Sequence, residues 1–220
     1  NNMPRREISE NKNLRRGNKS EILLRGMKPE ITDYLKDYLA GFITVLFKIS
    51  ISDIQRIIDK LIIIKKQKGR LFLIGIGGSA ANCSHAVNDF RKICHIEAYT
   101  PTDNVAELTA RINDDGWDSI FSNWLKESNL NKKDVVLVFS VGGGNIKKNI
   151  STNIVKALKY AKSKKSTILG IVSRDGGYTK KVADVYMLIP IVSEATITPY
   201  AETFQAVIWH AIVNYPELQR

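Results

Sequence analysis

Two pairs of histidine and carboxylate residues have a spacing that places both side chains on one side of a helix. His85 and Asp89 are four residues apart, and Glu202 and His210 are eight residues apart. With 3.6 residues per helical turn, each pair projects to one side of its helix. If the two helices meet, two imidazoles and two carboxylates form a cluster that suits zinc or iron. The same groups could act as acid and base in a proton transfer.

Each pair also has a purely structural explanation, and both explanations stay open at this point. A histidine and an aspartate four residues apart are often only a contact on the helix surface. His210 lies near the apolar face of its segment, where a histidine is often part of the core. The glycine-rich turns that accompany both pairs favour a functional site.

Two glycine- and serine-rich segments each connect an apolar run to a helical segment. They are residues 75–82 (GIGGSAAN) and 140–145 (SVGGGN), and the second leads to a helix near Ser151. Glycines let the backbone approach an anion, and a helix start supplies free N–H groups and a positive dipole end. The loop residues predicted to bind a phosphate are Gly77, Gly78, Ser79, Asn82, Ser140, Gly142, Gly143, Gly144, Asn145 and Ser151.

The first of these segments also matches the dinucleotide-binding pattern G-x-G-x-x-G/A. That pattern expects an acidic residue about 20 positions further on, and Asp103 follows Ala80 by 23 residues. A nicotinamide-dependent enzyme with a Rossmann-type fold is therefore an alternative. Two helical segments before the first strand, and a second glycine loop that the pattern does not use, argue against it.

The elements that position these residues follow from hydrophobic periodicity. Apolar residues recur at helical spacing in residues 34–46 and 54–62, and Ser52 is the predicted N-cap of the second helix. From residue 71 onward, short apolar runs alternate with amphipathic stretches, which is typical of βαβ units around a parallel sheet buried on both faces. The predicted strands are 71–75, 96–99, 135–139, 167–172 and 185–190, and the helical stretches lie near 80–92, 104–112, 117–128, 150–164 and 199–214.

Ligands of such a sheet bind beyond the carboxyl ends of its strands. Asn104 and Thr109 follow the second predicted strand at this edge, and they are predicted to bind substrate hydroxyls. The alternative is that they only cap the next helix.

Length and composition fit one domain with a basic tail. The 220 residues are 44% hydrophobic, and the longest apolar runs are far shorter than the ~20 residues of a membrane span. Neither a membrane partner nor a secretory leader is expected. The two cysteines indicate a reducing compartment, so a cytoplasmic location is expected. Residues 1–20 are predicted to be a disordered or tag-like basic tail, followed by one domain over residues 21–220.

The formal net charge is +11, which by itself would suggest a nucleic acid or an anionic ligand. The basic residues, however, occur in the tail, at helix ends and in short clusters. No aromatic residues are interleaved with them, as base stacking would need. This distribution favours a solvated basic surface, and no nucleic-acid partner is expected.

Residues 75–89 (GIGGSAANCSHAVND) resemble the first phosphate loop and helix of the SIS-domain sugar isomerases, in particular the phosphoheptose isomerases (sedoheptulose 7-phosphate isomerases). Residues 135–158, 174–177 (RDGG) and 198–210 (TPYAETFQAVIWH) resemble the same family. The resemblance implies an α/β fold with a five-stranded parallel sheet flanked by helices. This is a SIS-type, flavodoxin-like three-layer sandwich with a hairpin of two leading N-terminal helices.

The resemblance also implies chemistry. It implies a homotetramer with sites at subunit interfaces, and a sugar phosphate held by Ser79, Ser140 and Ser151. It implies one Zn²⁺ per subunit, with Asp89 as the base and His210 as the acid or proton shuttle. The expected reaction converts D-sedoheptulose 7-phosphate to D-glycero-D-manno-heptose 7-phosphate through an enediol, for the heptose of a lipopolysaccharide or capsule. The implied metal ligands are His85, Asp89, Glu202 and His210.

Three positions depart from the family pattern. Asp89 replaces a glutamate, and Glu202 replaces a glutamine. The serine-rich second loop is replaced by residues 141–145 (VGGGN) and an insertion. These departures leave a second hypothesis open, a non-catalytic SIS protein that binds a sugar phosphate.

Overall fold

The computed structural model describes residues 28–220. The described residues divide into two units, so that residues 28–39 belong to the first unit and residues 40–220 form the second. Helix α2 (Pro29–Lys48) begins in the first unit and ends in the second. The predicted tail, residues 1–20, lies outside the described residues. All the predicted site residues lie within residues 40–220.

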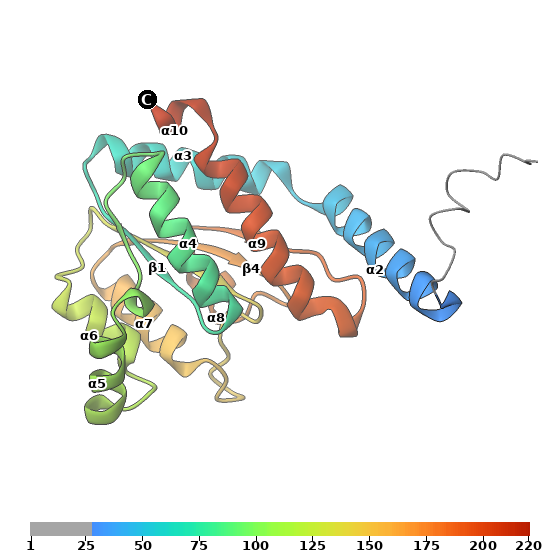
Figure 1. Cartoon of the computed structure of the whole chain (residues 1–220). Helices are drawn as coiled ribbons and strands as arrows, with labels where there is room; N and C mark the ends of the chain where they lie inside the picture. Colours follow the sequence, from blue (N-terminus) through green and yellow to red (C-terminus); the bar gives the residue numbers. More distant parts are fainter. Residues whose placement is uncertain (1–27) are drawn as a thin grey trace, which may run out of the picture. The chain divides into compact units, whose positions relative to one another are not determined.

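The second unit is built on a parallel sheet of five strands in the order β2-β1-β3-β4-β5 (Figure 1). This confirms the predicted fold class. The order is that of flavodoxin-like sheets, whereas dinucleotide-binding Rossmann sheets have the order 3-2-1-4-5-6. The topology thus argues against the nicotinamide alternative. The strands are β1 (Leu71–Ile74), β2 (Ala98–Tyr99), β3 (Val135–Ser140), β4 (Thr167–Val172) and β5 (Val185–Leu188).

Helices cover both faces of this sheet and complete the predicted three layers (Figure 1). One face carries α3 (Ile51–Lys66), α4 (Gly78–Lys92) and α9 (Ile197–Val213). The other face carries α5 (Val105–Asp115), α6 (Ile120–Glu127), α7 (Thr152–Ser163) and α8 (Gly177–Val182). The short helix α10 (Pro216–Gln219) follows α9. Every residue of β1 and β3 is buried, as expected for strands with helices on both sides.

Alternate residues of each strand supply the cores of the two layers. Phe72, Ile74 and Val136 pack in a buried cluster with residues of α6 and α7. On the opposite face, α4 contacts β1 and β3, and α9 contacts β3 and β4. The last part of α2 covers α9, where Phe42 stacks on Phe204 with the ring centroids 4.4 Å apart.

The two leading helices are present, but the predicted cap of the second one is wrong. Ser50, and not Ser52, is the N-cap of α3, because the Ser50 hydroxyl accepts a hydrogen bond from the Asp53 amide at 3.3 Å. Helices α8 and α10 were not predicted, since each is too short to show a helical period.

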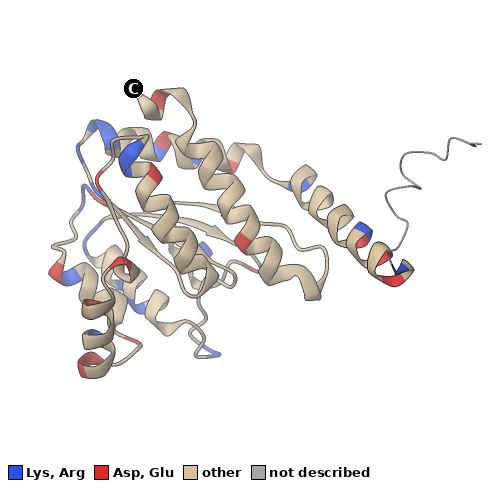
Figure 2. Ribbon diagram, in the orientation of Figure 1, with Lys and Arg blue, Asp and Glu red and all other residues tan. Residues whose placement is uncertain are grey.

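Many basic residues lie in the last turns of the helices (Figure 2). Lys65 and Lys66 end α3, Arg91 and Lys92 end α4, and Lys162 ends α7. Cations at these positions interact favourably with the negative end of the helix dipole. In a βα fold the helices run antiparallel to the strands, so their last turns lie at the amino ends of the strands. A good part of the positive charge therefore lies at the edge opposite the predicted site.

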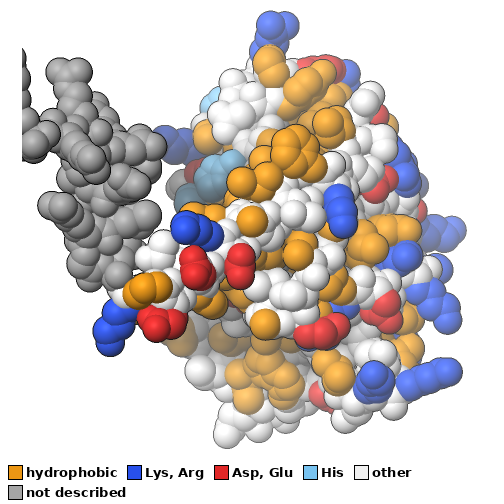
Figure 3. All heavy atoms as spheres, turned by 90° about the vertical axis from the view of Figure 1, so that its right-hand side faces the viewer, with side chains coloured by type: hydrophobic (Ala, Val, Ile, Leu, Met, Phe, Trp, Pro, Cys, Tyr) orange, Lys and Arg blue, Asp and Glu red, His pale blue; other side chains and the backbone are white. Residues whose placement is uncertain are grey.

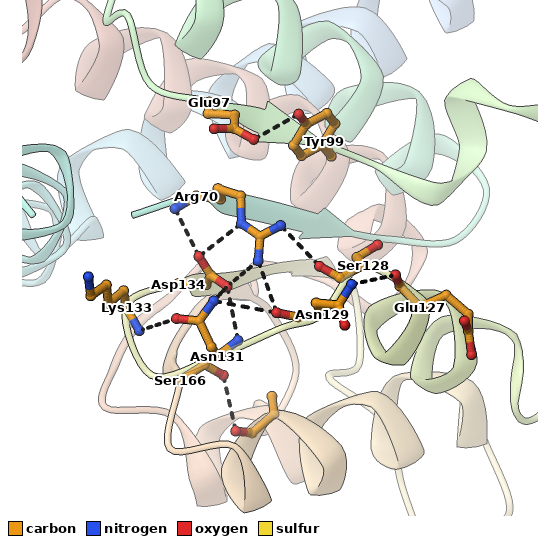
Figure 4. Close-up of polar contacts among 11 residues, drawn as sticks. Arg70, Glu97, Tyr99, Glu127, Ser128, Asn129, Asn131, Lys133, Asp134 and Ser166 are labelled. Carbon is orange, nitrogen blue, oxygen red and sulfur yellow. Dashed lines mark hydrogen bonds and ion pairs between the residues drawn. The ribbon is translucent and has the colours of Figure 1, made fainter. Parts of the chain in front are cut away.

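A buried ion pair joins β1 and β3 at that same edge (Figure 4). The Asp134 carboxylate accepts hydrogen bonds from the backbone amide, Nε and Nη2 of Arg70, at 3.1, 3.2 and 2.8 Å. It also accepts from the backbone amide and the side-chain amide of Asn131. The side chain of Asp134 is only 2% exposed. The hydrogen bond to this carboxylate raises the pKa of Arg70, so the pair holds the sheet together as an ion pair.

Replacement of Asp134 by alanine is expected to lower the free energy of unfolding by about 1–3 kcal/mol, because it removes the buried acceptor of the Arg70 and Asn131 backbone amides. Urea unfolding followed by circular dichroism measures the loss. Glu217→Ala is the matched control, since it breaks the exposed pair of Glu217 with Lys66. That change should cost less than about 1 kcal/mol. Equal losses in the two variants would contradict a special role for the buried pair.

The two cysteines are free and buried, as the sequence suggests for small apolar residues. Burial raises the pKa of the Cys94 thiol to about 11, and it raises the pKa of the Cys83 thiol as well. Both thiols therefore stay protonated at neutral pH. Among the described residues, no helix combines the length and the hydropathy that a membrane span requires.

Candidate functional site

Helices α4 and α9 lie side by side and run in the same direction (Figure 1). Near their starts, the Asn82 side-chain amide donates to the Glu202 carbonyl at 2.8 Å and to Gln205 Oε1 at 3.0 Å. Gln205 Nε2 in turn donates to Ser79 Oγ at 3.1 Å. Gln205 and Ser79 are buried, so these bonds fix the register of the two helices. Asn82, predicted to bind phosphate, thus has a structural role here.

Further along this helix pair, the structure brings together His85, Asp89 and His210. Asp89 Oδ2 lies 3.9 Å from the Nε2 atoms of both His85 and His210. The possible ligand atoms of the three residues all lie within 4.8 Å of one another. The sequence predicted a cluster if the two helices meet. They do meet, and three of the four predicted residues lie together.

Neighbouring groups orient the cluster. His210 Nδ1 lies 2.8 Å from the Ala206 carbonyl, which can only accept, so Nδ1 carries a proton and Nε2 faces Asp89. Asn88 Nδ2 donates to Asp89 Oδ1 at 2.9 Å, and this leaves Oδ2 toward the two imidazoles. Trp209 is buried and stacks on His210 with the ring centroids 3.5 Å apart. The tautomer of His210 is therefore defined, and its ring packs on a buried side chain.

The cluster is open to solvent on one side. The side chains of His85 and His210 are 59% and 45% exposed, whereas that of Asp89 is 14% exposed. Figure 3 shows histidine side chains at the surface of the face that it draws, beside exposed hydrophobic side chains. A ligand or a second protein surface can therefore reach the imidazoles.

The donor set fits a zinc ion. Two imidazole nitrogens and one carboxylate oxygen are a common set of three protein ligands, with further positions open for water or substrate. The Nδ1 hydrogen bond from His210 to a backbone carbonyl is the outer contact that usually orients a zinc-binding histidine.

Glu202, predicted as a fourth ligand, is not part of this cluster among the described residues. Its carboxylate lies against Gly78 at the start of α4, so close that a Cβ atom on Gly78 would stand 2.3 Å from Glu202 Oε2. A glycine at position 78 leaves the space that this carboxylate occupies. The negative charge of Glu202 therefore sits beside the first of the two predicted phosphate loops.

A pocket of about 650 Å³ lies at the carboxyl ends of β1, β3 and β4. This place includes the point between β1 and β3 where the strand order reverses, the usual ligand site in open α/β sheets. Ser79 follows β1, and Ser140 ends β3. The predicted phosphate-binding residues that line the pocket are Ser79, Ser140, Gly142, Gly144, Asn145 and Ser151.

Close backbone packing shapes the loop after β3. Gly143 has a φ of +67°, and a Cβ atom there would stand 2.1 Å from the Gly176 carbonyl oxygen. The Gly143 amide donates to Ser140 Oγ at 3.0 Å, and the Gly143 carbonyl accepts from the Thr179 hydroxyl at 2.8 Å. Gly143 thus has a structural reason, since only glycine lets the loops after β3 and β4 approach this closely.

The remaining predicted residues lie outside the lining of this pocket. Asn104 is the N-cap of α5 and accepts from the Glu107 amide at 3.2 Å, which is the capping alternative. The Thr109 hydroxyl donates to the Val105 carbonyl of its own helix at 2.8 Å. Gly77, Gly78 and Gly143 shape the loops without lining the pocket. A contact of Asn104 or Thr109 with substrate hydroxyls stays a prediction.

The two cations of the pocket were not predicted as site residues from the sequence. Lys148 and Arg174 line the pocket together with the three serines. Arg174 belongs to the segment 174–177, whose composition indicates only a turn, and it has a left-handed φ of 50°. Its place after β4, at the carboxyl edge of the sheet, is the signal that could have identified it.

The sequence and the fold are similar to those of known proteins. Residues 34–173 match the SIS domain family, and the chain belongs to that family. Within it, the chain is similar to the phosphoheptose isomerases. The phosphoheptose isomerase of Trichlorobacter lovleyi is 30% identical over 169 residues, which are 74% of this chain and 82% of the relative.

Two further similarities concern length and fold. The lincomycin biosynthesis protein LmbN of Streptomyces lincolnensis is 27% identical over 154 residues, which are 66% of this chain and 54% of LmbN. The chain thus spans about half the length of that relative. The structure of phosphoheptose isomerase GmhA from Neisseria gonorrhoeae superposes with a TM-score of 0.72 at 22% identity. It covers 84% of this chain and 97% of that one, which supports the shared fold.

Proposed function

We propose that this chain is a sugar-phosphate isomerase that converts D-sedoheptulose 7-phosphate to D-glycero-D-manno-heptose 7-phosphate. The observation that carries the proposal is the carboxylate of Asp89, which faces two imidazoles across the contact of α4 and α9. The similarity to phosphoheptose isomerases supports the substrate class. The product would serve heptose synthesis for a surface glycan.

The proposed reaction moves one proton between two carbons and one between two oxygens, so ketose and aldose stay isomers. Asp89 takes the proton from C1 of the ketose, and an enediol forms across C1 and C2. The same carboxyl group returns a proton to C2. His210 exchanges a proton through Nε2, since its Nδ1 proton is held by the Ala206 carbonyl, and it carries the second proton between the oxygens of C1 and C2.

We further propose that His85, Asp89 and His210 hold a zinc ion in the resting protein. Because Nε2 of His210 cannot bind an ion and exchange a proton at once, Asp89 and His210 would have to leave the ion while they exchange protons. When bound, the ion supplies positive charge that stabilises the developing charge on the substrate oxygens. Participation of Glu202 would require its carboxylate to leave Gly78. The role of Glu202 as a fourth ligand or as a substrate-binding group therefore stays a separate prediction.

The pocket at the strand ends is the proposed phosphate site. Ser79 and His85 are six residues apart on α4, which corresponds to about 9 Å along the helix axis. The phosphate pocket and the acid–base cluster are thus separated along α4, which favours an extended sugar phosphate over a three-carbon one.

We also propose that the chain forms a homotetramer and acts in the cytoplasm. The assembly is supported by Ile43, Leu46 and Phe47 of α2, which are exposed large apolar residues, with Phe47 84% exposed. Exposed apolar surface of this kind is common at protein–protein interfaces. Light scattering after size-exclusion chromatography measures the assembly.

Turnover of sedoheptulose 7-phosphate by the purified, zinc-loaded protein, followed by NMR, tests the function. Metal-dependent appearance of the heptose phosphate is expected, and a sample treated with a chelator is the control. The second candidate is a non-catalytic sugar-phosphate-binding protein, favoured by the altered loop after β3. It predicts a rise in the melting temperature with the same sugar and no product.

A further inference from the structure

The insertion after the triple glycine forms a small hairpin at the mouth of the pocket. Asn145 and Ile150 form an antiparallel bridge, with N–O distances of 2.8 Å and 3.0 Å. Asn145 Oδ1 accepts from the Lys148 amide at 2.9 Å and closes the turn. This hairpin, residues 145–150, is held by its own backbone and carries two adjacent lysines at its tip.

The two lysines lie on different sides of the hairpin. Lys148 lines the pocket that also contains Ser79, Ser140 and Ser151. Lys147 instead lines a neighbouring hollow of about 310 Å³. The hairpin thus presents one cation to the proposed phosphate site and the other cation away from it.

The lining of the pocket contains both cations and anions. Lys148 and Arg174 are its cations, and Asp175 and Glu194 are its anions. Within residues 28–220, neither cation has a side-chain partner, whereas Asp175 accepts from the Gly177 amide. Both cations lie at the carboxyl edge of the sheet, where no helix end requires a positive charge. A favourable interaction with a helix dipole, which explains the lysines and arginines in the last turns of the helices, therefore does not explain these two cations.

The first glycine loop is poorly suited to hold the anion alone. The Glu202 carboxylate lies against Gly78 and places a negative charge at the start of α4. A phosphate with about two negative charges needs compensation, and serine hydroxyls supply none. Ammonium and guanidinium groups supply both charge and hydrogen bonds to phosphate oxygens.

We propose that Lys148, carried by the hairpin 145–150, is a phosphate-binding residue of the pocket and acts together with Arg174. The anionic end of the substrate is then held by charge, on a structure formed by the insertion. The carboxylates of Asp175 and Glu194 line the same pocket and can accept hydrogen bonds from hydroxyls next to the phosphate. This inference rests on the proposed function for the identity of the ligand, but the anion site can be tested without turnover.

The test compares Lys148→Met with Lys147→Met, a matched loss of one charge from the same hairpin. Titration calorimetry with inorganic phosphate measures affinity in the absence of catalysis. Lys148→Met is expected to weaken phosphate binding by about tenfold or more, as for loss of a charged hydrogen bond. Lys147→Met should stay within about twofold of the unchanged protein. Lys148→Arg should retain most of the affinity.

The outcomes separate the inference from the proposed function. Equal affinity in Lys148→Met and the unchanged protein, or equal losses in both lysine variants, would overturn the inference. So would an unchanged protein that does not bind phosphate. Phosphate binding that depends on Lys148, without turnover of sedoheptulose 7-phosphate, would support the anion site and overturn the isomerase. Where turnover occurs, the loss in Lys148→Met should fall mainly on KM for the sugar phosphate.

Discussion

Replacement of Asp89 by asparagine is expected to reduce the turnover of sedoheptulose 7-phosphate by about 10²–10⁴-fold, the usual contribution of a general base. The amide has nearly the shape of the carboxylate but cannot accept the proton of C1. The side chain is 14% exposed and its Oδ1 accepts from Asn88, so the fold should persist. The rate is measured by NMR at a zinc concentration shown to saturate the variant, so that the loss reports on the base and not on lost zinc, and circular dichroism checks the fold.

Asp103→Asn is the control for this loss. Asp103 lies in a short turn (Pro101–Asp103) ahead of α5, outside both the cluster and the pocket lining. Its replacement should leave the rate within about threefold, the margin for surface changes of ±0.5 kcal/mol. His210→Gln should resemble Asp89→Asn, and Asp89→Glu should retain measurable turnover because it keeps a base. Near-normal rates in Asp89→Asn and His210→Gln would overturn the assigned roles.

The sheet could be predicted from the sequence because burial on both faces leaves unbroken apolar runs. Residues 135–139 and 167–172 are such runs, and they agree with β3 and β4 to within one residue. The run 96–99 indicated a longer strand than β2 (Ala98–Tyr99), which lies at the edge of the sheet and pairs only with β1. Edge strands are often short, so the apolar pattern overstates their length.

The site could be predicted only in part, because helical spacing fixes direction around one helix but not contacts between two helices. Glu202 and His210 project to one side of α9, yet eight residues separate them by about 12 Å along the axis. Since α4 and α9 run in the same direction, Glu202 lies near the start of α4 and His210 lies near Asp89. The spacing therefore suggested four residues in one cluster where the structure has three.

Lys148 and Arg174 were missed for a different reason. Both are long charged side chains in loops, and such residues are usually solvated, so their type carries little information by itself. Their importance depends on where β3 and β4 end, and on the hairpin that turns Lys148 toward the pocket. Only the three-dimensional arrangement shows that these two cations share a pocket with three serines.

Zinc binding should depend on the three clustered residues and hardly on Glu202. His85→Ala and His210→Ala each remove a ligand, so each is expected to lower zinc affinity by more than about 100-fold. Loss of an outer-shell partner alone costs about 10–100-fold. Competition with a coloured chelator measures the affinity without any need for turnover.

Glu202→Gln separates the two places that its carboxylate could occupy. The structure has this carboxylate at Gly78 and outside the cluster, so the variant should bind zinc within about threefold of the unchanged protein. If Glu202 is a ligand, the same change removes a charged donor, and the affinity should fall as far as in His210→Ala. The variant also removes the negative charge beside the first loop, so its phosphate affinity should rise. A large loss of zinc affinity in Glu202→Gln would therefore show that Glu202 is a zinc ligand and does not stay beside Gly78.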